Sequence, residues 1–260
     1  MKNATLAASL LTAIAIVPFQ TAYAEEDGKF TLETGMDRNT GKYGGSQSTD
    51  ILYVPFTGKY QGGSWTLKMT VPYLQITGPG NVINVINGIA TTGAASTPIT
   101  RSGLGDVVVA ATRNAYNGGS SGFMVNLTGK VKLGTADSAK GLGTGKNDYA
   151  FQSELFQVTK SITTFGTLGY RFYGSPVGYT LNNIFYGSLG ASYKYDQETN
   201  AGIMFTLSQK TTAKGSTHVE TILFASHKLD KNWKTQGYVL KGFTNSVPSW
   251  GIGATISYRL

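Results

Sequence analysis

The chain contains no cysteine, only two histidines, and few charged residues, which make up 14% of the total. Without cysteine there is no disulfide, no thiolate metal ligand and no cysteine nucleophile. No cluster of His, Asp and Glu shows metal-ligand spacing, so the sequence predicts neither a metal site nor another cofactor. Lys and Arg exceed Asp and Glu by eight, but they form no basic run, which argues against nucleic acid as a partner.

A long apolar run is also missing after the first residues. Lys2, the apolar stretch Leu6 to Val17 and the small-x-small site Ala22-Tyr23-Ala24 have the pattern of an export signal. This apolar stretch is shorter than the roughly 20 residues that a spanning helix needs. We therefore expect a cleaved signal peptide at residues 1–24, followed by one domain at 25–260. Since that domain has no further run of this kind, it can cross a membrane only as a closed barrel.

What the chain does have is the composition of a β-sheet protein, with 34 Gly, 15 Tyr and 12 Phe. The stretch Phe123 to Gly134 shows the pattern clearly. Phe123, Val125, Leu127, Val131 and Leu133 occupy one set of alternate positions, and Lys130 and Lys132 lie in the other set. A period of two indicates an extended strand with one apolar and one polar face.

The same alternation between turn signals predicts about twelve strands. Most are long for soluble strands, which usually have five or six residues, and they reach the roughly nine to eleven that a tilted membrane strand needs. The predicted ranges are 28–38, 48–60, 64–77, 103–116, 121–134, 148–159, 162–174, 182–195, 200–211, 217–229, 232–244 and 249–260.

The predicted connections alternate between short and long. Short turns follow the second, fourth, sixth, eighth and tenth strands, and the longer links lie at 39–47, 78–102, 135–147, 175–181, 212–216 and 245–248. An up-and-down antiparallel transmembrane β-barrel has tight periplasmic turns and longer external loops, and an even strand number places both termini on the periplasmic side. The alternative, a periplasmic or secreted β-sandwich, leaves this asymmetry unexplained.

The apolar strand faces support the barrel. In the last strand Trp250, Ile252, Ala254 and Ile256 alternate with Gly and Thr, and aromatic residues recur near strand ends. We expect these faces to contact lipid and the polar faces to line a wet interior. Aromatic side chains near the ends are typical of the two membrane interfaces. Phe156, Ile222 and Phe224 interrupt the polar faces.

Charged residues on the polar faces are the candidates for lumen and selectivity sites. They are Lys59, Lys68, Asp106, Lys130, Lys132, Glu154, Arg171, Lys194, Lys210 and Glu220. Bases outnumber acids in this set, and a cationic surplus in a narrow bore favours anions. The alternative is that acids and bases pair across the lumen and plug it. The long loop 78–102 has two interpretations as well, a constriction folded into the mouth or an external loop.

Two further motifs contain residue types that occur in binding or catalytic sites. Gly141 to Gly145 lacks the strand-to-helix setting and the lysine-serine ending of a phosphate-binding loop, so we interpret it as a plain loop. Ser216 and His218 lie two positions apart near a predicted strand end. There is no nucleophile elbow and no evident orienting acid, and we expect no enzymatic activity.

Several segments resemble a known family. Ser102-Gly103-Leu104-Gly105-Asp106-Val107, then Lys132-Leu133-Gly134-Thr135, and then the segment Gly141 to Tyr149 are similar to outer-membrane proteins of the phenol meta-pathway degradation family. The match covers residues 100–260 best. Gly253 to Tyr258 is similar to the terminal signal by which outer-membrane barrels are recognised for assembly. The resemblance implies an outer-membrane transporter or porin for organic compounds, with no established substrate.

Together these patterns predict a bacterial outer-membrane channel with a polar, net-basic lumen. It would pass small organic solutes by diffusion, with anionic and aromatic compounds as candidates. The expected partners are outer-membrane lipid and lipopolysaccharide, the solutes themselves and the barrel-assembly machinery. The rival hypothesis is a non-conducting structural or adhesion barrel whose external loops bind a partner.

Overall fold

The structure is a computed structural model that describes residues 28–79, 82–85, 88–91, 97–178, 180–213 and 215–260. The predicted signal peptide, residues 1–24, lies outside the described residues. The strands are β1 (Lys29–Gly41), β2 (Thr49–Gly62), β3 (Trp65–Pro79), β4 (Val82–Val85), β5 (Gly88–Thr91), β6 (Pro98–Leu104), β7 (Val107–Asn117), β8 (Phe123–Leu133), β9 (Asp148–Thr159), β10 (Ile162–Phe172), β11 (Ile184–Lys194), β12 (Thr199–Ser208), β13 (His218–Lys228), β14 (Trp233–Gly242) and β15 (Trp250–Arg259).

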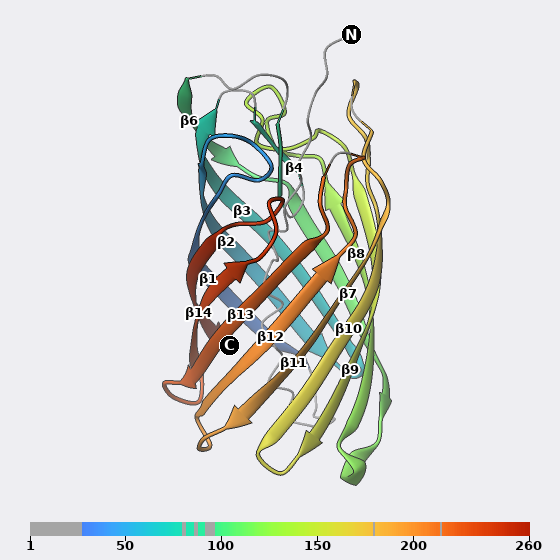
Figure 1. Ribbon diagram of the computed structural model, residues 1–260. Helices are drawn as coiled ribbons and strands as arrows, with labels where there is room; N and C mark the ends of the chain where they lie inside the picture. Colours follow the sequence, from blue (N-terminus) through green and yellow to red (C-terminus); the bar gives the residue numbers. More distant parts are fainter. Residues whose placement is uncertain (1–27, 80–81, 86–87, 92–96, 179, 214) are drawn as a thin grey trace.

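One sheet of antiparallel strands closes on itself as a barrel (Figure 1). It has thirteen strand segments. Since β6 and β7 pair in turn with β3, they form a single crossing strand, and the wall has twelve strands. The ring closes where β1 pairs with β15. The predicted up-and-down barrel of about twelve strands is therefore confirmed.

β1 ends at Gly41 instead of 38, since residues 39–41 pair with β2. The other strand bounds differ from the predicted ones mainly at two places. β6 begins at Pro98 instead of 103, because residues 98–104 pair with the far end of β3, which extends to Pro79. β12 ends at Ser208 instead of 211. Both differences depend on pairing with a neighbouring strand, and alternation within one segment does not contain that information.

Short turns gather at one end of the barrel and longer loops at the other, as Figure 1 shows. We call these the short-turn end and the long-loop end. Asp196 and Asp230 close two of the short turns with their side chains, which accept backbone N–H bonds from Glu198 and Thr199 and from Asn232 and Trp233. These bonds hold the pKa of both carboxyl groups below its usual range, since they stabilise the ionised form.

The outward face of the barrel is apolar. Phe56, Leu67, Phe151, Leu189 and Ile252 are exposed, and they alternate along their strands with less exposed residues. In β8 the exposed Phe123, Leu127 and Leu133 face outward, while Met124, Asn126, Thr128 and Lys132 are buried on the inner face. Such an exterior requires a hydrocarbon environment.

Aromatic side chains mark both ends of this exterior. Trp65, Tyr195 and Trp233 are exposed near the short-turn end, and Tyr149 and Trp250 near the long-loop end. This distribution is typical of the two girdles of a membrane barrel. No helix in the described part of the chain is long and apolar enough to cross a membrane.

The predicted loop 78–102 is partly taken up by strands. β3 and β6 include its two ends, and β4 and β5 pair with each other as a separate hairpin at the long-loop end. The remaining positions 80–81, 86–87 and 92–96 lie outside the described residues.

Candidate functional site

The barrel interior is the candidate site, and the strand registers place most of the predicted lumen residues on it. Inward positions alternate along each strand and pair across the ladder with inward positions of the neighbours. Eight of the ten candidates lie on the inner face within the wall: Lys59, Lys68, Asp106, Lys130, Lys132, Glu154, Arg171 and Glu220.

The other two candidates lie at strand ends. Lys194 is the last residue of β11 and is exposed at the short-turn end. Lys210 lies beyond the end of β12, is exposed, and donates from Nζ to the Ala213 carbonyl oxygen at 3.0 Å. Because β12 stops at Ser208, the alternation that predicted an inward Lys210 does not extend to it.

Sequence reasoning missed several inward charges. Glu33 and Asp37 on β1, Asp148 on β9, Lys234 on β14 and Arg259 on β15 also lie at inward positions. The signal was present, because Phe30, Leu32 and Met36 occupy the alternate positions of β1. Lys29, Arg101 and Lys228 share this inward parity, because they pair with Gln61, Ile76 and Lys234. Bases therefore outnumber acids on the inner wall, and the strand register shows which of them are neighbours.

Five of the cations form one row of cross-strand neighbours. Starting at the short-turn end, the paired inward positions are Arg259, Thr31, Lys59, Lys68, Ala110, Lys130, Ala150 and Arg171. A ladder of paired positions runs across the strands, and it climbs the wall because the strands are tilted. We call Arg259, Lys59, Lys68, Lys130 and Arg171 the cationic row.

Neighbouring members of the cationic row are close enough for their like charges to repel one another. Lys59 interacts with Lys68 and Arg259, and Lys130 interacts with Lys68 and Arg171. Arg171 ends the row near the long-loop end, where its guanidinium lies 5.0 Å from the centre of the Tyr186 ring and donates to the Tyr173 hydroxyl at 3.2 Å. The small Thr31, Ala110 and Ala150 between the cations leave the bases as the longest side chains of the row.

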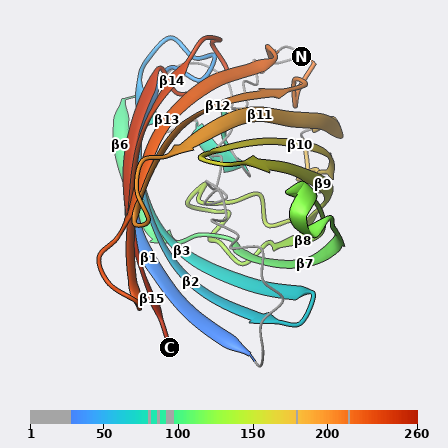
Figure 2. The same ribbon diagram turned by 90° about the horizontal axis from the view of Figure 1, so that it is seen from below.

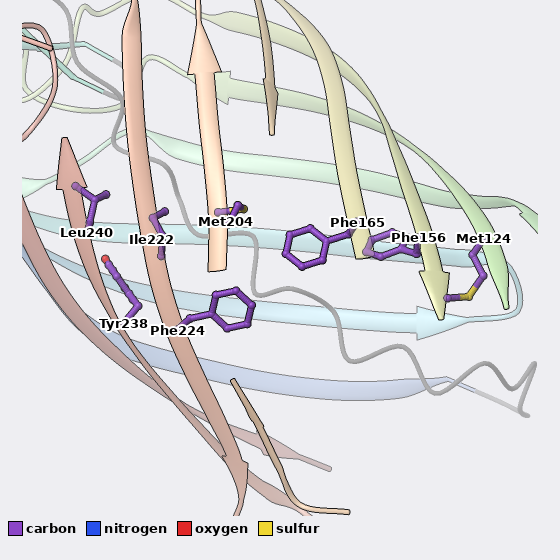
Figure 3. Packing of buried hydrophobic residues seen from close by; sticks show 8 residues of the cluster. All are labelled: Met124, Phe156, Phe165, Met204, Ile222, Phe224, Tyr238 and Leu240. Atoms are coloured by element: carbon purple, nitrogen blue, oxygen red, sulfur yellow. The ribbon is translucent and has the colours of Figure 1, made fainter. Parts of the chain in front are cut away.

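A second row of inward neighbours is mostly apolar, with Asn39 as its polar member. From β8 at the short-turn end to β3 at the long-loop end, the paired positions are Met124, Phe156, Phe165, Gly190, Met204, Ile222, Leu240, Gly251, Asn39, Ile51 and Ile76. Phe224 and Tyr238 pack beside it (Figure 3). We call this set the apolar row. Its members explain why Phe156, Ile222 and Phe224 break the polar alternation in the sequence.

Glycines on neighbouring strands leave space in which the inner aromatic rings lie against the wall. A Cβ built on Gly190 would lie 2.4 Å from the Phe165 ring, and one built on Gly253 would lie 2.3 Å from the Tyr238 ring. A Cβ built on Gly202 would lie 2.5 Å from the Phe224 ring. Such short separations mean that each ring covers its glycine. The rings therefore lie flat against the inner wall, where they are buried.

The loop 134–147 between β8 and β9 folds into the barrel, and we call it the inward loop. Figure 2, viewed from the short-turn end, shows it inside the ring of strands. Its Leu142 packs in one buried cluster with Ile51, Leu74 and Ile76, which belong to β2 and β3 on another part of the wall. The inward loop thus extends the apolar surface at the long-loop end. It contains Gly141 to Gly145, which no helix follows.

A buried ion triad anchors the inward loop. Lys132 Nζ lies 2.9 Å from Asp106 Oδ2 and 3.2 Å from Asp148 Oδ2, and its residue is only 2% exposed. Lys132 Nζ also donates to Thr144 Oγ1 of the loop at 3.2 Å, and the Ala136 N–H donates to Asp106 Oδ1 at 2.9 Å. β8, β9, the junction between β6 and β7, and the loop therefore meet at one charged centre.

Ser216 and His218 have contacts within the barrel wall and its loops. Ser216 Oγ forms a hydrogen bond of 2.9 Å with Ser246 Oγ, and His218 is buried on the inner face of β13. In the described residues no group of three or more His, Cys, Asp or Glu side chains could hold a metal ion.

Comparisons with known proteins agree with this geometry. Residues 25–260 match the family described as "Putative MetA-pathway of phenol degradation". No protein among the curated ones matches the chain.

Solved barrels share the fold at low sequence identity. The COG4313 outer membrane channel from Pseudomonas putida F1 superposes with a TM-score of 0.71 at 12% identity, over 92% of this chain and 98% of that one. A NanC porin gives a TM-score of 0.54 at 10% identity, over 88% and 100% of the two chains. A KdgM porin gives 0.50 at 14% identity, over 88% and 98%.

Proposed function

Because the chain belongs to the phenol-degradation family that residues 25–260 match, we propose that it is an outer-membrane channel for passive diffusion of small organic solutes, with a preference for anions. The observation that carries the proposal is the cationic row, which leads along the inner wall from the short-turn end to the long-loop end. The fold shared with a COG4313 outer membrane channel supports it.

The row supplies a physical basis for anion preference. Fixed charges act strongly in a narrow aqueous bore with low-dielectric walls, since field lines are focused there. Glu33 and Glu154 interact with members of the row, but they are two acids beside five bases. Asp106 and Asp148 are engaged by Lys132 at the base of the inward loop. The path along the row is therefore cationic.

We further propose that the barrel lies in the outer membrane with both termini periplasmic. The short-turn end then faces the periplasm, and the long-loop end faces outward. In this orientation the apolar exterior contacts lipid and lipopolysaccharide, and the last strand, β15, is the segment that the barrel-assembly machinery would recognise. Transport runs down a gradient, and the protein has no enzymatic role.

Planar bilayers test the proposal. The purified mature chain should give single-channel steps in KCl, with a reversal potential that shows chloride preferred over potassium. The variant Lys68→Gln/Lys130→Gln should move the chloride-to-potassium permeability ratio toward unity, because it neutralises two neighbouring cations of the cationic row.

Lys241→Gln is the matched control. Lys241 is exposed on the outer face of β14, opposite Trp250 in the ladder, so its charge lies outside the bore. An equal shift of the ratio in this control would contradict the assignment of the row. Silence from well-folded wild-type protein would favour the rival, a structural or adhesion barrel whose bore the inward loop blocks.

A further inference from the structure

Charged residues are almost absent from the outward face of the barrel. Among the outward positions of the wall strands, all of which the structure describes, only Arg38, Asp50, Arg113 and Lys241 are acidic or basic. A charge on the lipid face is unfavourable at the middle of a bilayer and is tolerated near its two interfaces. All of these residues except Arg113 lie near the long-loop end, on β1, β2 and β14, which belong to one run of neighbouring strands.

Arg38 and Lys241 flank the long-loop end of β15, and both are exposed. Arg38 pairs with Ile252 from the β1 side, which Figure 2 shows beside β15, and Lys241 pairs with Trp250 from the β14 side. Two strand spacings and one two-residue step place their Cα atoms roughly 12 Å apart. Because the ladder climbs from β14 to β1, this step is largely cancelled in height, and the two cations lie at a similar depth in the membrane.

The protein itself does not neutralise these two cations. None of the ion pairs among the described residues includes Arg38 or Lys241. The acid on this face, Asp50, belongs to β2, on the side of Arg38 that is remote from β15. No acid therefore separates the two cations, and an anion that lies between them interacts favourably with both.

The wall beside the cations matches the body of a lipid. Trp250, which lies between them, belongs to the aromatic girdle at the long-loop end. Toward the middle of the membrane Ile252 pairs with Val239, and Val239 pairs with Leu223, and all three are exposed. The same face thus presents cations and an indole at the level of lipid headgroups and aliphatic side chains at the level of acyl chains.

We propose that Arg38, Lys241 and Trp250 form a binding site on the outside of the barrel for the phosphate-bearing headgroup of lipid A, the membrane anchor of lipopolysaccharide. This inference rests on the proposed function, because the long-loop end must face outward for this wall to meet lipopolysaccharide. The phosphate accepts hydrogen bonds from the guanidinium and ammonium groups. The acyl chains lie against Ile252 and Val239.

Native mass spectrometry tests this inference on the mature chain, refolded in detergent without lipopolysaccharide and titrated with lipid A that carries both phosphates. We expect one lipid A molecule to bind the wild-type barrel more tightly than any further molecule. The variant Arg38→Gln/Lys241→Gln should raise the dissociation constant of this molecule about tenfold, because charge-assisted hydrogen bonds to phosphate are lost. Lipid A without phosphate groups should bind wild type and variant equally.

Arg113→Gln is the matched control. Arg113 is also an exposed, outward cation, but it lies near the short-turn end, 5.8 Å from the centre of the Trp65 ring. Its replacement should leave lipid A binding unchanged. Arg38→Gln alone should also raise the dissociation constant, and it decides the question if the double variant does not fold.

Three results would overturn the inference. They are equal lipid A binding by wild type and the Arg38→Gln/Lys241→Gln variant, an equal loss in Arg113→Gln, and phosphatidylglycerol bound by wild type as tightly as lipid A. Silence of the well-folded wild-type protein in planar bilayers would instead refute the proposed channel. Because the lipid titration measures no current, failure of the lipid site and failure of the channel function are distinguishable.

Discussion

Glycine acts at the residue scale by leaving space for a neighbour's ring. The Tyr238 ring lies over Gly253, and the three atoms nearest to a Cβ at Gly253 all belong to that ring. Cross-strand aromatic and glycine pairs of this kind are a known device of sheets. Here they decide whether an aromatic residue narrows the bore or lines it.

Gly253→Ala tests this role. The added methyl group displaces the Tyr238 ring from the wall toward the bore, so single-channel conductance in KCl should fall while the barrel still folds. Gly237→Ala is the control, because Gly237 lies on the outer face of the neighbouring strand and its Cβ would meet no atom nearer than 3.8 Å. Equal conductance in the two variants would show that the ring does not border the ion path.

At the scale of elements, the inward loop depends on a buried charge centre. Lys132 is enclosed between Asp106 and Asp148, whose side chains are 11% and 2% exposed. A buried pair is weak support for stability as a whole, but removal of one partner leaves the other charges uncompensated. The centre therefore fixes the position of the loop once the barrel is formed.

Lys132→Met should lower the free energy of unfolding by about 3–5 kcal/mol, the usual loss when a buried ion pair is broken. Denaturant titration in lipid vesicles measures it, and the released loop should also increase current noise in bilayers. Lys140→Met is the control, because Lys140 and Asp137 in the same loop form an exposed pair at 3.6 Å. Such pairs contribute at most about 1 kcal/mol. A similar loss in both variants would count against the anchoring role.

At the scale of the whole molecule, the proposed anion selectivity depends on a row of charges that no single strand contains. The cationic row takes its members from β15, β2, β3, β8 and β10. Its field acts through the water of the bore, so dissolved salt screens it. The screening length is about 10 Å at 0.1 M salt and about 3 Å at 1 M.

The chloride-to-potassium permeability ratio should therefore fall toward unity when KCl rises from 0.1 M to 1 M. Reversal potentials at a fixed concentration gradient measure the ratio at each salt level. A ratio that does not change with salt would mean that contact with individual groups, and not the field of the row, selects the ion.

Much of the fold follows from local patterns. The alternation of Phe123 to Leu133 predicts a strand with a lipid face, and long strands joined alternately by short turns and long loops predict the up-and-down barrel. These features are local because the side-chain period of a strand and the length of a connection are properties of one segment. The same logic places Lys68, Lys130 and Glu154 on the inner face.

Local patterns fail where pairing or a fold-back decides the outcome. Lys210 follows the alternation of its segment but lies past the end of β12. The sequence leaves loop 78–102 open between a constriction and an external loop and gives loop 134–147 no inward role. In the structure the loop 134–147 carries the buried anchor and reaches the inner wall of β2 and β3. The contacts of Leu142 with Ile51 and Ile76 join residues far apart in the chain, and no local spacing encodes them.

By itself, then, the sequence determined the strand faces, the strand number and the direction of the charges that lie well inside a strand, such as Lys68 and Lys130, since these depend on a period of two and on turn lengths. Only the tertiary structure decided which charges become neighbours. Closure of the ring sets the register of each strand, and the register aligns Lys59, Lys68 and Lys130 in one row and Phe165, Met204 and Ile222 in the other. A shift of a single strand by two residues would keep every face and break both rows.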